Sequence, residues 1–139
     1  MTPTRFHLAF PVHDLSLAKK FYTDILECEV GRESNNWIDF NLFGHQIVAH
    51  LSPDDCNLSM TNYVDGDNVP SRHFGLILHW DEWEKLYKKL QKNNIMFYIK
   101  PKIRFKDQNG EQGTFFLKDP SGNALEFKSF KDFKYIFKK

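Results

Sequence analysis

Residues 7–21, HLAFPVHDLSLAKKF, and residues 73–87, HFGLILHWDEWEKLY, follow the same order of a strand and then a helix. A shift of 66 residues (73 − 7) aligns His7 with His73 at the start of the two stretches. In each stretch, alternating apolar residues predict a half-buried strand, and apolar residues three or four positions apart predict an amphipathic helix. An internal repeat decides a fold, so these stretches predict two similar modules. The alternative is that two unrelated strand–helix units share this spacing.

The segments that follow each helix complete the two modules. In the first module, CysGluVal (28–30) leads to Gly31 and predicts a short strand, and residues 37–43 and 46–51 alternate around a turn at Gly44 and predict a hairpin. Residues 95–105, 112–119 and 124–130 predict three further strands. The order is therefore βαβββ twice, in an α+β domain that spans residues 1–139 and whose curved mixed sheets form a cleft. The chain divides into a first module, a connecting loop, a second module and a basic, aromatic tail, at residues 5–51, 52–72, 73–130 and 131–139.

Composition narrows the class of partner. The 19 Lys and Arg balance 18 Asp and Glu to a formal net charge of +1, which argues against a nucleic acid or a membrane surface. Apolar runs are too short to span a membrane, and the N-terminal residues lack the features of a signal peptide. Cys28 and Cys56 form no CxxC motif, as is typical of a reduced protein. We expect a cytoplasmic protein that binds a small molecule.

Four polar residues on the predicted strands face away from the apolar stripes that pack on the helices. If strand sides alternate, His7, His50, His73 and Glu126 line the cleft between the helix-free faces. Imidazole and carboxylate ligands suit a divalent metal such as iron, zinc, nickel or copper. Two His and one carboxylate are also the ligands of non-haem Fe(II) oxygenases. The alternative for each residue is an ordinary hydrogen-bonded or solvated side chain.

Aromatic residues on the predicted strands are candidates for the wall of a substrate pocket or for the core: Trp37, Phe40, Phe97, Phe105, Phe115 and Phe116. We take Trp37, Phe40, Phe97 and Phe115 as the substrate-binding candidates, because pockets for small molecules are lined mainly by apolar and aromatic side chains. Arg104 would hold an acidic group of the substrate. Its alternative is a solvated charge at the edge of a sheet.

The repeat, the His at the start of each module and the closing stretch DPSGNALEF (119–127) resemble the vicinal oxygen chelate superfamily. This superfamily includes glyoxalase I, extradiol dioxygenases, and fosfomycin- and bleomycin-resistance proteins. The likeness covers residues 5–130. It implies a fold of two βαβββ modules and a metal bound by His7, His73 and Glu126.

The resemblance also marks a departure. Glyoxalase I carries a Glu ligand on its fourth strand, and aligning the predicted hairpin places His50 there. His50 is our candidate catalytic base, and the alternatives are a fourth ligand or a hydrogen-bond partner of a ligand.

The implied function is a metal-dependent enzyme that chelates two adjacent oxygens of a small molecule. It would be a dioxygenase, or a lyase or isomerase of the glyoxalase type. Fe²⁺ is the favoured ion, with Zn²⁺, Ni²⁺ or Mn²⁺ as alternatives, and a homodimer is expected. The rival is a non-catalytic drug-binding or resistance protein of the same fold. A fosfomycin-type transferase would need a cluster of Lys, Arg and Tyr near the metal, which the sequence alone does not locate.

Overall fold

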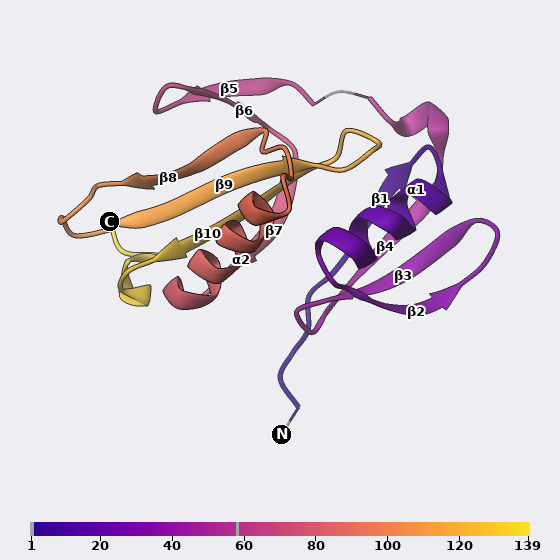
Figure 1. Cartoon of the computed structure of the whole chain (residues 1–139), viewed down its shortest axis with the longest axis horizontal. Helices are drawn as coiled ribbons and strands as arrows, with labels where there is room; N and C mark the ends of the chain where they lie inside the picture. The colour runs from indigo at the N-terminus through magenta and orange to yellow at the C-terminus, as the bar shows by residue number, and fades with distance from the viewer. Residues whose placement is uncertain (1, 58) are drawn as a thin grey trace. The chain divides into compact units, whose positions relative to one another are not determined.

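The computed structural model describes residues 2–57 and 59–139. These form two compact units, one of residues 2–57 with 119–123 and the other of residues 59–118 with 124–139. Each unit contains the predicted βαβββ order, a mixed four-stranded sheet with a helix on one face (Figure 1). In both sheets the first strand pairs in parallel with the last, and the other pairs are antiparallel. The sequence prediction of two α+β modules is therefore confirmed.

The first unit begins with a strand that is followed by a helix with an N-cap residue. Asp14 precedes α1, and its Oδ1 accepts a hydrogen bond from the Leu17 backbone N–H at 3.0 Å, which satisfies a donor in the first turn. The helix then widens into a π-helical turn over Phe21–Ile25, so the predicted helix has two parts. The sheet order is β1-β4-β3-β2. The elements are β1 (His7–Val12), α1 (Leu15–Lys20), β2 (Glu29–Glu33), β3 (Trp37–Leu42) and β4 (His45–Leu51).

Tyr22 is the centre of the first core. Its ring centroid lies 5.4 Å from that of Phe10 and 5.1 Å from that of Phe40, and the side chain is fully buried. The Tyr22 hydroxyl donates to Asp119 Oδ2 at 2.8 Å, and Asp119 also accepts from the Asn123 backbone N–H at 2.9 Å. The DPSGN turn is thus held by a buried carboxylate.

The second unit repeats the pattern with a longer helix. Its sheet order is β7-β10-β9-β8. Trp83 of α2 is buried against the sheet, its Nε1 donates to the Phe127 carbonyl at 2.9 Å, and a Cβ at Gly113 would overlap its ring. The core therefore lies between α2 and one face of the sheet. The elements are β7 (His73–Ile77), α2 (Trp80–Lys92), β8 (Ile99–Arg104), β9 (Gln112–Lys118) and β10 (Ala124–Phe130).

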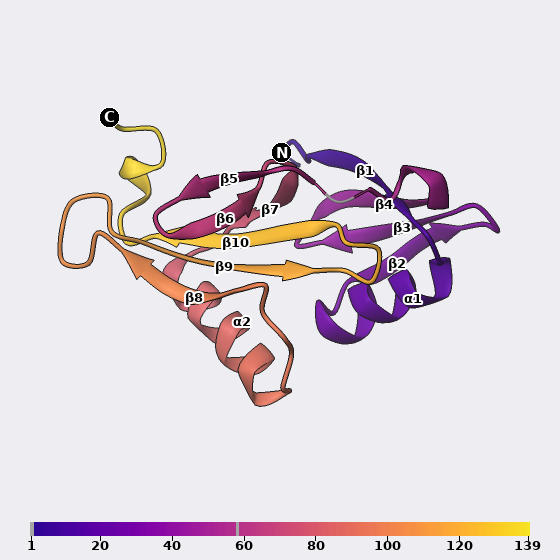
Figure 2. The same cartoon turned by 90° about the horizontal axis from the view of Figure 1, so that it is seen from above.

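The segment predicted as a connecting loop, residues 52–72, differs from the prediction. It contains a short 3₁₀ turn at Pro53–Asp55 and a two-stranded hairpin, β5 (Thr61–Val64) with β6 (Asp67–Pro70). Asp65 and Gly66 both have positive φ, 46° and 89°, as a type I′ hairpin turn requires. Figure 2 shows the β5–β6 hairpin running beside the sheet of its own unit.

Two smaller findings concern the thiols and the helices. Both cysteines are free, and burial raises the pKa of the Cys28 thiol to about 12, so this thiol is a poor nucleophile. Among the described residues, no helix is long and apolar enough to cross a membrane.

Candidate functional site

Strand register determines which side chains share the open face of the second sheet, the face opposite α2. Glu126 on β10 is paired with Gly75 on β7 and with Phe116 on β9. Paired residues project to the same side of a sheet, and side chains alternate along a strand. His73, two residues before Gly75, therefore shares this face with Glu126. The predicted sides of both residues agree with the register.

His73 and Glu126 face each other across this surface. His73 Nε2 lies 3.3 Å from Glu126 Oε1, and His73 Nδ1 lies 2.7 Å from the Pro70 carbonyl oxygen. A carbonyl only accepts, so Nδ1 carries a hydrogen and donates to Pro70. In a neutral imidazole, Nε2 then presents only a lone pair to the carboxylate oxygen Oε1, and the two electron-rich atoms repel each other. A proton or a metal ion between Nε2 and Oε1 removes this repulsion.

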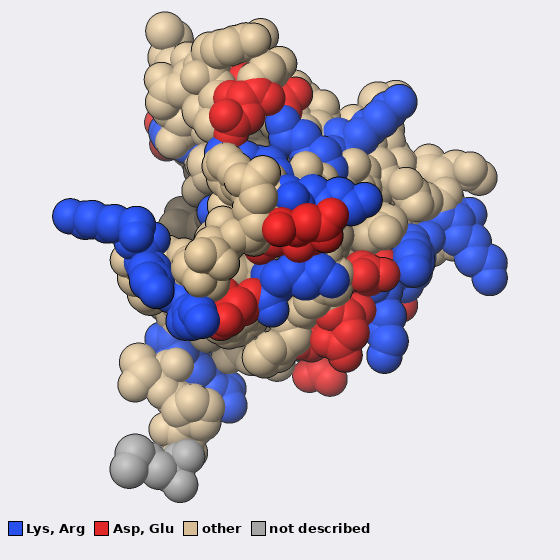
Figure 3. All heavy atoms as spheres, turned by 90° about the vertical axis from the view of Figure 1, so that its left-hand side faces the viewer, with Lys and Arg blue, Asp and Glu red and all other residues tan. Residues whose placement is uncertain are grey.

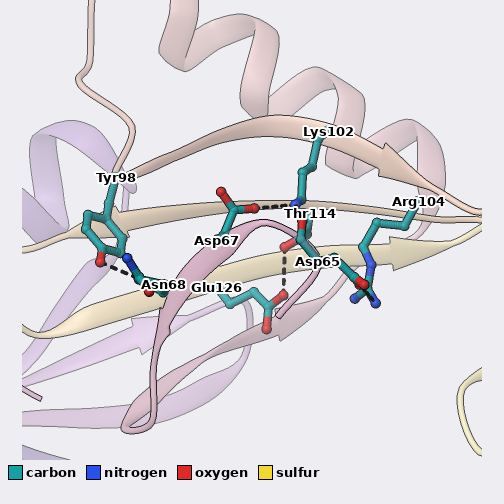
Figure 4. Close-up of polar contacts among 8 residues, drawn as sticks. All are labelled: Asp65, Asp67, Asn68, Tyr98, Lys102, Arg104, Thr114 and Glu126. Atoms are coloured by element: carbon teal, nitrogen blue, oxygen red, sulfur yellow. Dashed lines mark hydrogen bonds and ion pairs between the residues drawn. The ribbon is translucent and has the colours of Figure 1, made fainter. Parts of the chain in front are cut away.

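The other oxygen of Glu126 has its own partner. The Thr114 hydroxyl on β9 donates to Glu126 Oε2 at 2.6 Å (Figure 4). Each oxygen of the Glu126 carboxylate thus has its own partner, Oε1 the His73 ring and Oε2 the Thr114 hydroxyl. Outer partners of this kind orient the ligands of protein metal sites.

The ionisation of the pair follows from these contacts in the metal-free protein. The hydrogen bond to Glu126 raises the pKa of His73 against the opposing effect of burial. Burial by itself would raise the pKa of Glu126, but the hydrogen bonds from His73 and Thr114 outweigh it and lower the pKa. Both shifts favour a charged imidazolium–carboxylate pair.

A pocket of about 240 Å³ lies over this face. The β5–β6 hairpin supplies part of its wall, as Figure 4 shows for Asp65 and Asp67. Its charged lining comprises three cations and three carboxylates besides His73, and these are Lys102, Arg104, Lys128, Asp65, Asp67 and Glu126.

The surface shown in Figure 3 carries basic and acidic side chains interleaved with one another. A nucleic-acid-binding protein would instead show a surface of a single charge sign.

The first unit carries the other two predicted histidines. His7 on β1 is exposed and paired with Gln46, and His50 on β4 is exposed and paired with Trp37 and Pro11. They lie on the open face of the first sheet, as predicted.

The alignment that placed His50 at the fourth-strand ligand position needs correction. Ala9 is paired with Val48, and its counterpart in the repeat, Gly75, is paired with Glu126. Val48 is thus the counterpart of Glu126. His50 lies two residues further along, because the sequence alone does not fix the register between β1 and β4. The first sheet has a buried apolar side chain where the second has its carboxylate.

The predicted pocket aromatics fall mostly on the wrong faces. Phe40 is buried against Tyr22, and Phe115 is buried between Phe127 and Phe97, at centroid distances of 5.4 and 5.3 Å. Phe40 and Phe115 are core residues, and Phe97 is half-buried against the ring of Phe115.

Three other aromatic or basic residues lie on the open faces of the sheets, beside predicted site residues or in the pocket. Phe116, the neighbour of Phe115 on β9, lines the pocket with its ring centroid 5.2 Å from that of His73. Arg104 lines the same pocket. Trp37 is half-buried on the first sheet with the Arg32 guanidinium 5.4 Å from its ring centroid.

Sequence reasoning missed Thr114, Lys102 and the two hairpin carboxylates. Thr114 is two residues before Phe116 on β9, so strand alternation places it on the open face once the register of β9 with β10 is known. The dipeptide Asp65-Gly66 is the hairpin signal that would have revealed the carboxylates.

The donors of the second open face fit a divalent metal. Imidazole nitrogen and carboxylate oxygen are suitable ligands, and each here has an outer hydrogen-bond partner. Among residues 2–57 and 59–139, no three His, Cys, Asp or Glu side chains form a metal-binding group. The second unit thus holds two of the three predicted ligands, and His7 belongs to the first unit.

Comparisons with solved structures agree on the fold. A glyoxalase/bleomycin resistance protein/dioxygenase from Alicyclobacillus acidocaldarius is 36% identical, with 96% of each chain covered and a TM-score of 0.82. The fosfomycin resistance protein FosX from Listeria monocytogenes is 16% identical over 93% of this chain and 94% of its own, with a TM-score of 0.63. A lactoylglutathione lyase from Agrobacterium tumefaciens is 14% identical over 92% and 94%, with a TM-score of 0.61. The last two show the fold alone.

A search among curated proteins found no match. A family model does match, and it spans residues 5–127. This chain belongs to the Glyoxalase/Bleomycin resistance protein/Dioxygenase superfamily.

Proposed function

We propose that this chain is a metal-dependent enzyme that acts on a small molecule with two adjacent oxygens. His7, His73 and Glu126 would hold the metal, with Fe²⁺ favoured over Zn²⁺, Ni²⁺ or Mn²⁺. One observation carries the proposal, the Nε2 of His73 aimed at Glu126 Oε1 from 3.3 Å while Nδ1 is held by Pro70. This is the arrangement of a metal-binding histidine with its outer partner.

The metal would stabilise negative charge that develops on the two substrate oxygens. The protein's own groups set the geometry, since Pro70 fixes the ring of His73 and Thr114 fixes Glu126. A base is still needed to move a proton, and a histidine is the side chain best suited to this near neutral pH. His50 is our candidate for that role.

The counterpart of Glu126 in the first sheet bears on the type of reaction. Val48 offers no ligand there, which supports a set of two histidines and one carboxylate. Such a set with open positions suits Fe(II) oxygen chemistry. We therefore place a dioxygenase-like reaction ahead of a glyoxalase-like one.

Metal titration tests the proposal. Protein stripped with EDTA is titrated with Fe²⁺ under anaerobic conditions, and separately with Zn²⁺, Ni²⁺ and Mn²⁺, and bound metal is measured by elemental analysis. We expect stoichiometric uptake, and loss of uptake in His7→Ala, His73→Ala and Glu126→Ala. His79→Ala is the matched control, because His79 stacks on Phe133 outside the pocket. A wild-type protein that takes up no metal is a small-molecule binder, and the enzyme proposal is then wrong.

The role of His50 is tested with metal in place. In His50→Ala, retained metal with lost turnover supports the base. Retained metal with unchanged turnover excludes it.

A homodimer is part of the proposal, and a mixed-copy experiment tests how its sites are built. A His7→Ala chain is co-purified with a Glu126→Ala chain. If a site takes His7 from one copy and the other two ligands from its partner, the mixed dimer regains one intact site. If each site lies within one copy, the mixture binds no metal. Light scattering gives the oligomeric state, and a monomer would refute the homodimer.

A further inference from the structure

Two cations of β8 face the pocket of the second unit. Lys102 and Arg104 are paired with Thr114 and Gln112 on β9, so both project to the open face that carries Glu126. Both line the pocket. The Nε–H of Arg104 is buried and makes no hydrogen bond within the described part of the chain. A buried donor without an acceptor is unfavourable, so this atom is suited to an incoming anion.

The β5–β6 hairpin places carboxylates on both cations. Asp67 forms an ion pair with Lys102, and Asp65 forms one with Arg104 (Figure 4). Lys102 Nζ also donates to the Asp65 carbonyl at 3.1 Å. Asp65 and Asp67, two residues apart at the tip of the hairpin, thus pair with two cations that are also two residues apart on β8.

Little else attaches the tip of the hairpin to the sheet. β5 and β6 pair only with each other in the described strands, and the Tyr98 hydroxyl donates to the Asn68 carbonyl at 3.0 Å. The paired side chains are 28–49% exposed. Ion pairs with this much access to water are weak. A soluble anion can therefore compete with the hairpin carboxylates.

Charge balance indicates the class of that anion. With the hairpin in place, Asp67 balances the charge of Lys102 and Asp65 that of Arg104, while Glu126 is paired with His73. With Asp65 and Asp67 withdrawn, Lys102 and Arg104 lose both carboxylate partners, a local excess of two positive charges. A dianion restores the balance.

We propose that Lys102 and Arg104 form a binding site for a dianionic group of a small ligand, and that Asp65 and Asp67 occupy this site when no ligand is bound. The hairpin is thus an internal competitor. The inference names the substrate class for the pocket of the proposed function and rests on that function only in taking the pocket as the substrate site. A phosphate monoester and a dicarboxylate share the required chemistry.

The test uses full-length, EDTA-stripped protein and two probes, inorganic phosphate and malonate, in calorimetric titrations at constant ionic strength. The Asp65→Asn/Asp67→Asn double variant should bind at least one probe about tenfold more tightly than wild type, as expected if the hairpin closes the site in about nine molecules of ten. Lys102→Gln/Arg104→Gln should lose the binding. Phosphate alone identifies a tetrahedral oxyanion, and malonate alone identifies a dicarboxylate.

Matched controls lie elsewhere in the second unit. Asp132→Asn removes a carboxylate paired with Lys134, and Lys88→Gln removes a cation paired with Glu84, both outside the pocket. Neither should change the affinity for either probe. Circular dichroism establishes that each variant is folded.

Hydrogen exchange supplies a second readout. Saturating probe should speed amide exchange in residues 61–70 of the wild type, because the hairpin is displaced. Unchanged or slower exchange, or equal affinity of wild type and the Asn double variant, overturns the internal competitor. If neither probe binds either protein while metal still binds, the anion site is refuted and the proposed function stands. If a probe binds but no metal does, the anion site is supported and the proposed function fails.

Discussion

The open faces of the two sheets share their strand order and register, yet each places its carboxylate on a different strand. In the first sheet, Val48 on β4 is paired with Asp39 on β3. In the second sheet, the corresponding pair is Glu126 on β10 with Phe116 on β9. The apolar and acidic positions are exchanged between the two halves of the repeat.

The surroundings of the two carboxylates differ as well. Asp39 lies 3.7 Å from the Arg32 Nε and accepts from the Gln46 side chain at 3.4 Å, beside an open hollow of about 400 Å³. Glu126 instead faces an imidazole and a hydroxyl. The repeat therefore duplicates the backbone and not the chemistry. Within residues 2–57 and 59–139, the second half alone brings an imidazole nitrogen within 4 Å of a carboxylate oxygen.

The largest effect should follow from making the second face like the first. Glu126→Val places there the residue found at position 48 and removes a ligand, so we expect no stoichiometric metal by elemental analysis. Val48→Ala, on the first face, should keep full metal content. Metal retained by the Glu126→Val protein would show that the two faces do not differ in the way we propose.

The backbone beside Glu126 gives the next effect. A Cβ at Gly75 would overlap the backbone carbonyl of Glu126, whereas its counterpart Ala9 carries a side chain. Gly75→Ala should lower the free energy of unfolding by about 1–3 kcal/mol, the usual cost of overpacking, in chemical denaturation. Ala9→Ser, at an exposed position, should stay within about 0.5 kcal/mol of wild type. Equal stabilities of the two variants would contradict the close approach.

Loss of an outer partner should weaken the site without abolishing it. Thr114→Val removes the donor to Glu126 Oε2 and should reduce metal affinity about 10- to 100-fold, measured by competition with a chelator. Thr114→Ser keeps the hydroxyl and should restore affinity. Thr23→Val, which removes a hydroxyl from the first unit, is the control. If Thr114→Ser does not restore the metal affinity that Thr114→Val loses, the hydroxyl of residue 114 is not what supports metal binding.

The smallest effect is a pH dependence of stability in the stripped protein. The raised pKa of His73 contributes stability below its ordinary value of 6.5 and loses it as pH rises through the shifted pKa. The lowered pKa of Glu126 contributes above 4.5 and loses it as pH falls through the shifted pKa. The pair therefore stabilises most between these values, by about 1 kcal/mol.

Glu126→Gln should accordingly destabilise the stripped protein at pH 5.5 and have less effect at pH 9, in urea denaturation. Glu84→Gln is the control, because its partner Lys88 stays charged over this range. A Glu126→Gln effect of the same size at both pH values would show that His73 does not titrate against Glu126.

The sequence predicts the repeat and the sides of its key polar residues because both depend on local periodicity. His73 and Glu126 share the open face as alternation predicts. Phe115 and Phe116 are adjacent, so composition cannot tell which one lines the pocket, and only the register with β10 decides it. His50 was displaced by two positions for the same reason. The β5–β6 hairpin was missed because all four residues of β5 are exposed and give no apolar alternation.

The hairpin also bears on how relatives of this protein can diverge. Its strands belong to neither four-stranded sheet in the described chain, so its tip can change in length or charge without disturbing a sheet. Its last residue, Pro70, is buried and fixes the ring of His73. Substitutions at Asp65 and Asp67 can therefore alter the pocket without disturbing a sheet, while the root of the same hairpin remains constrained by its contact with His73.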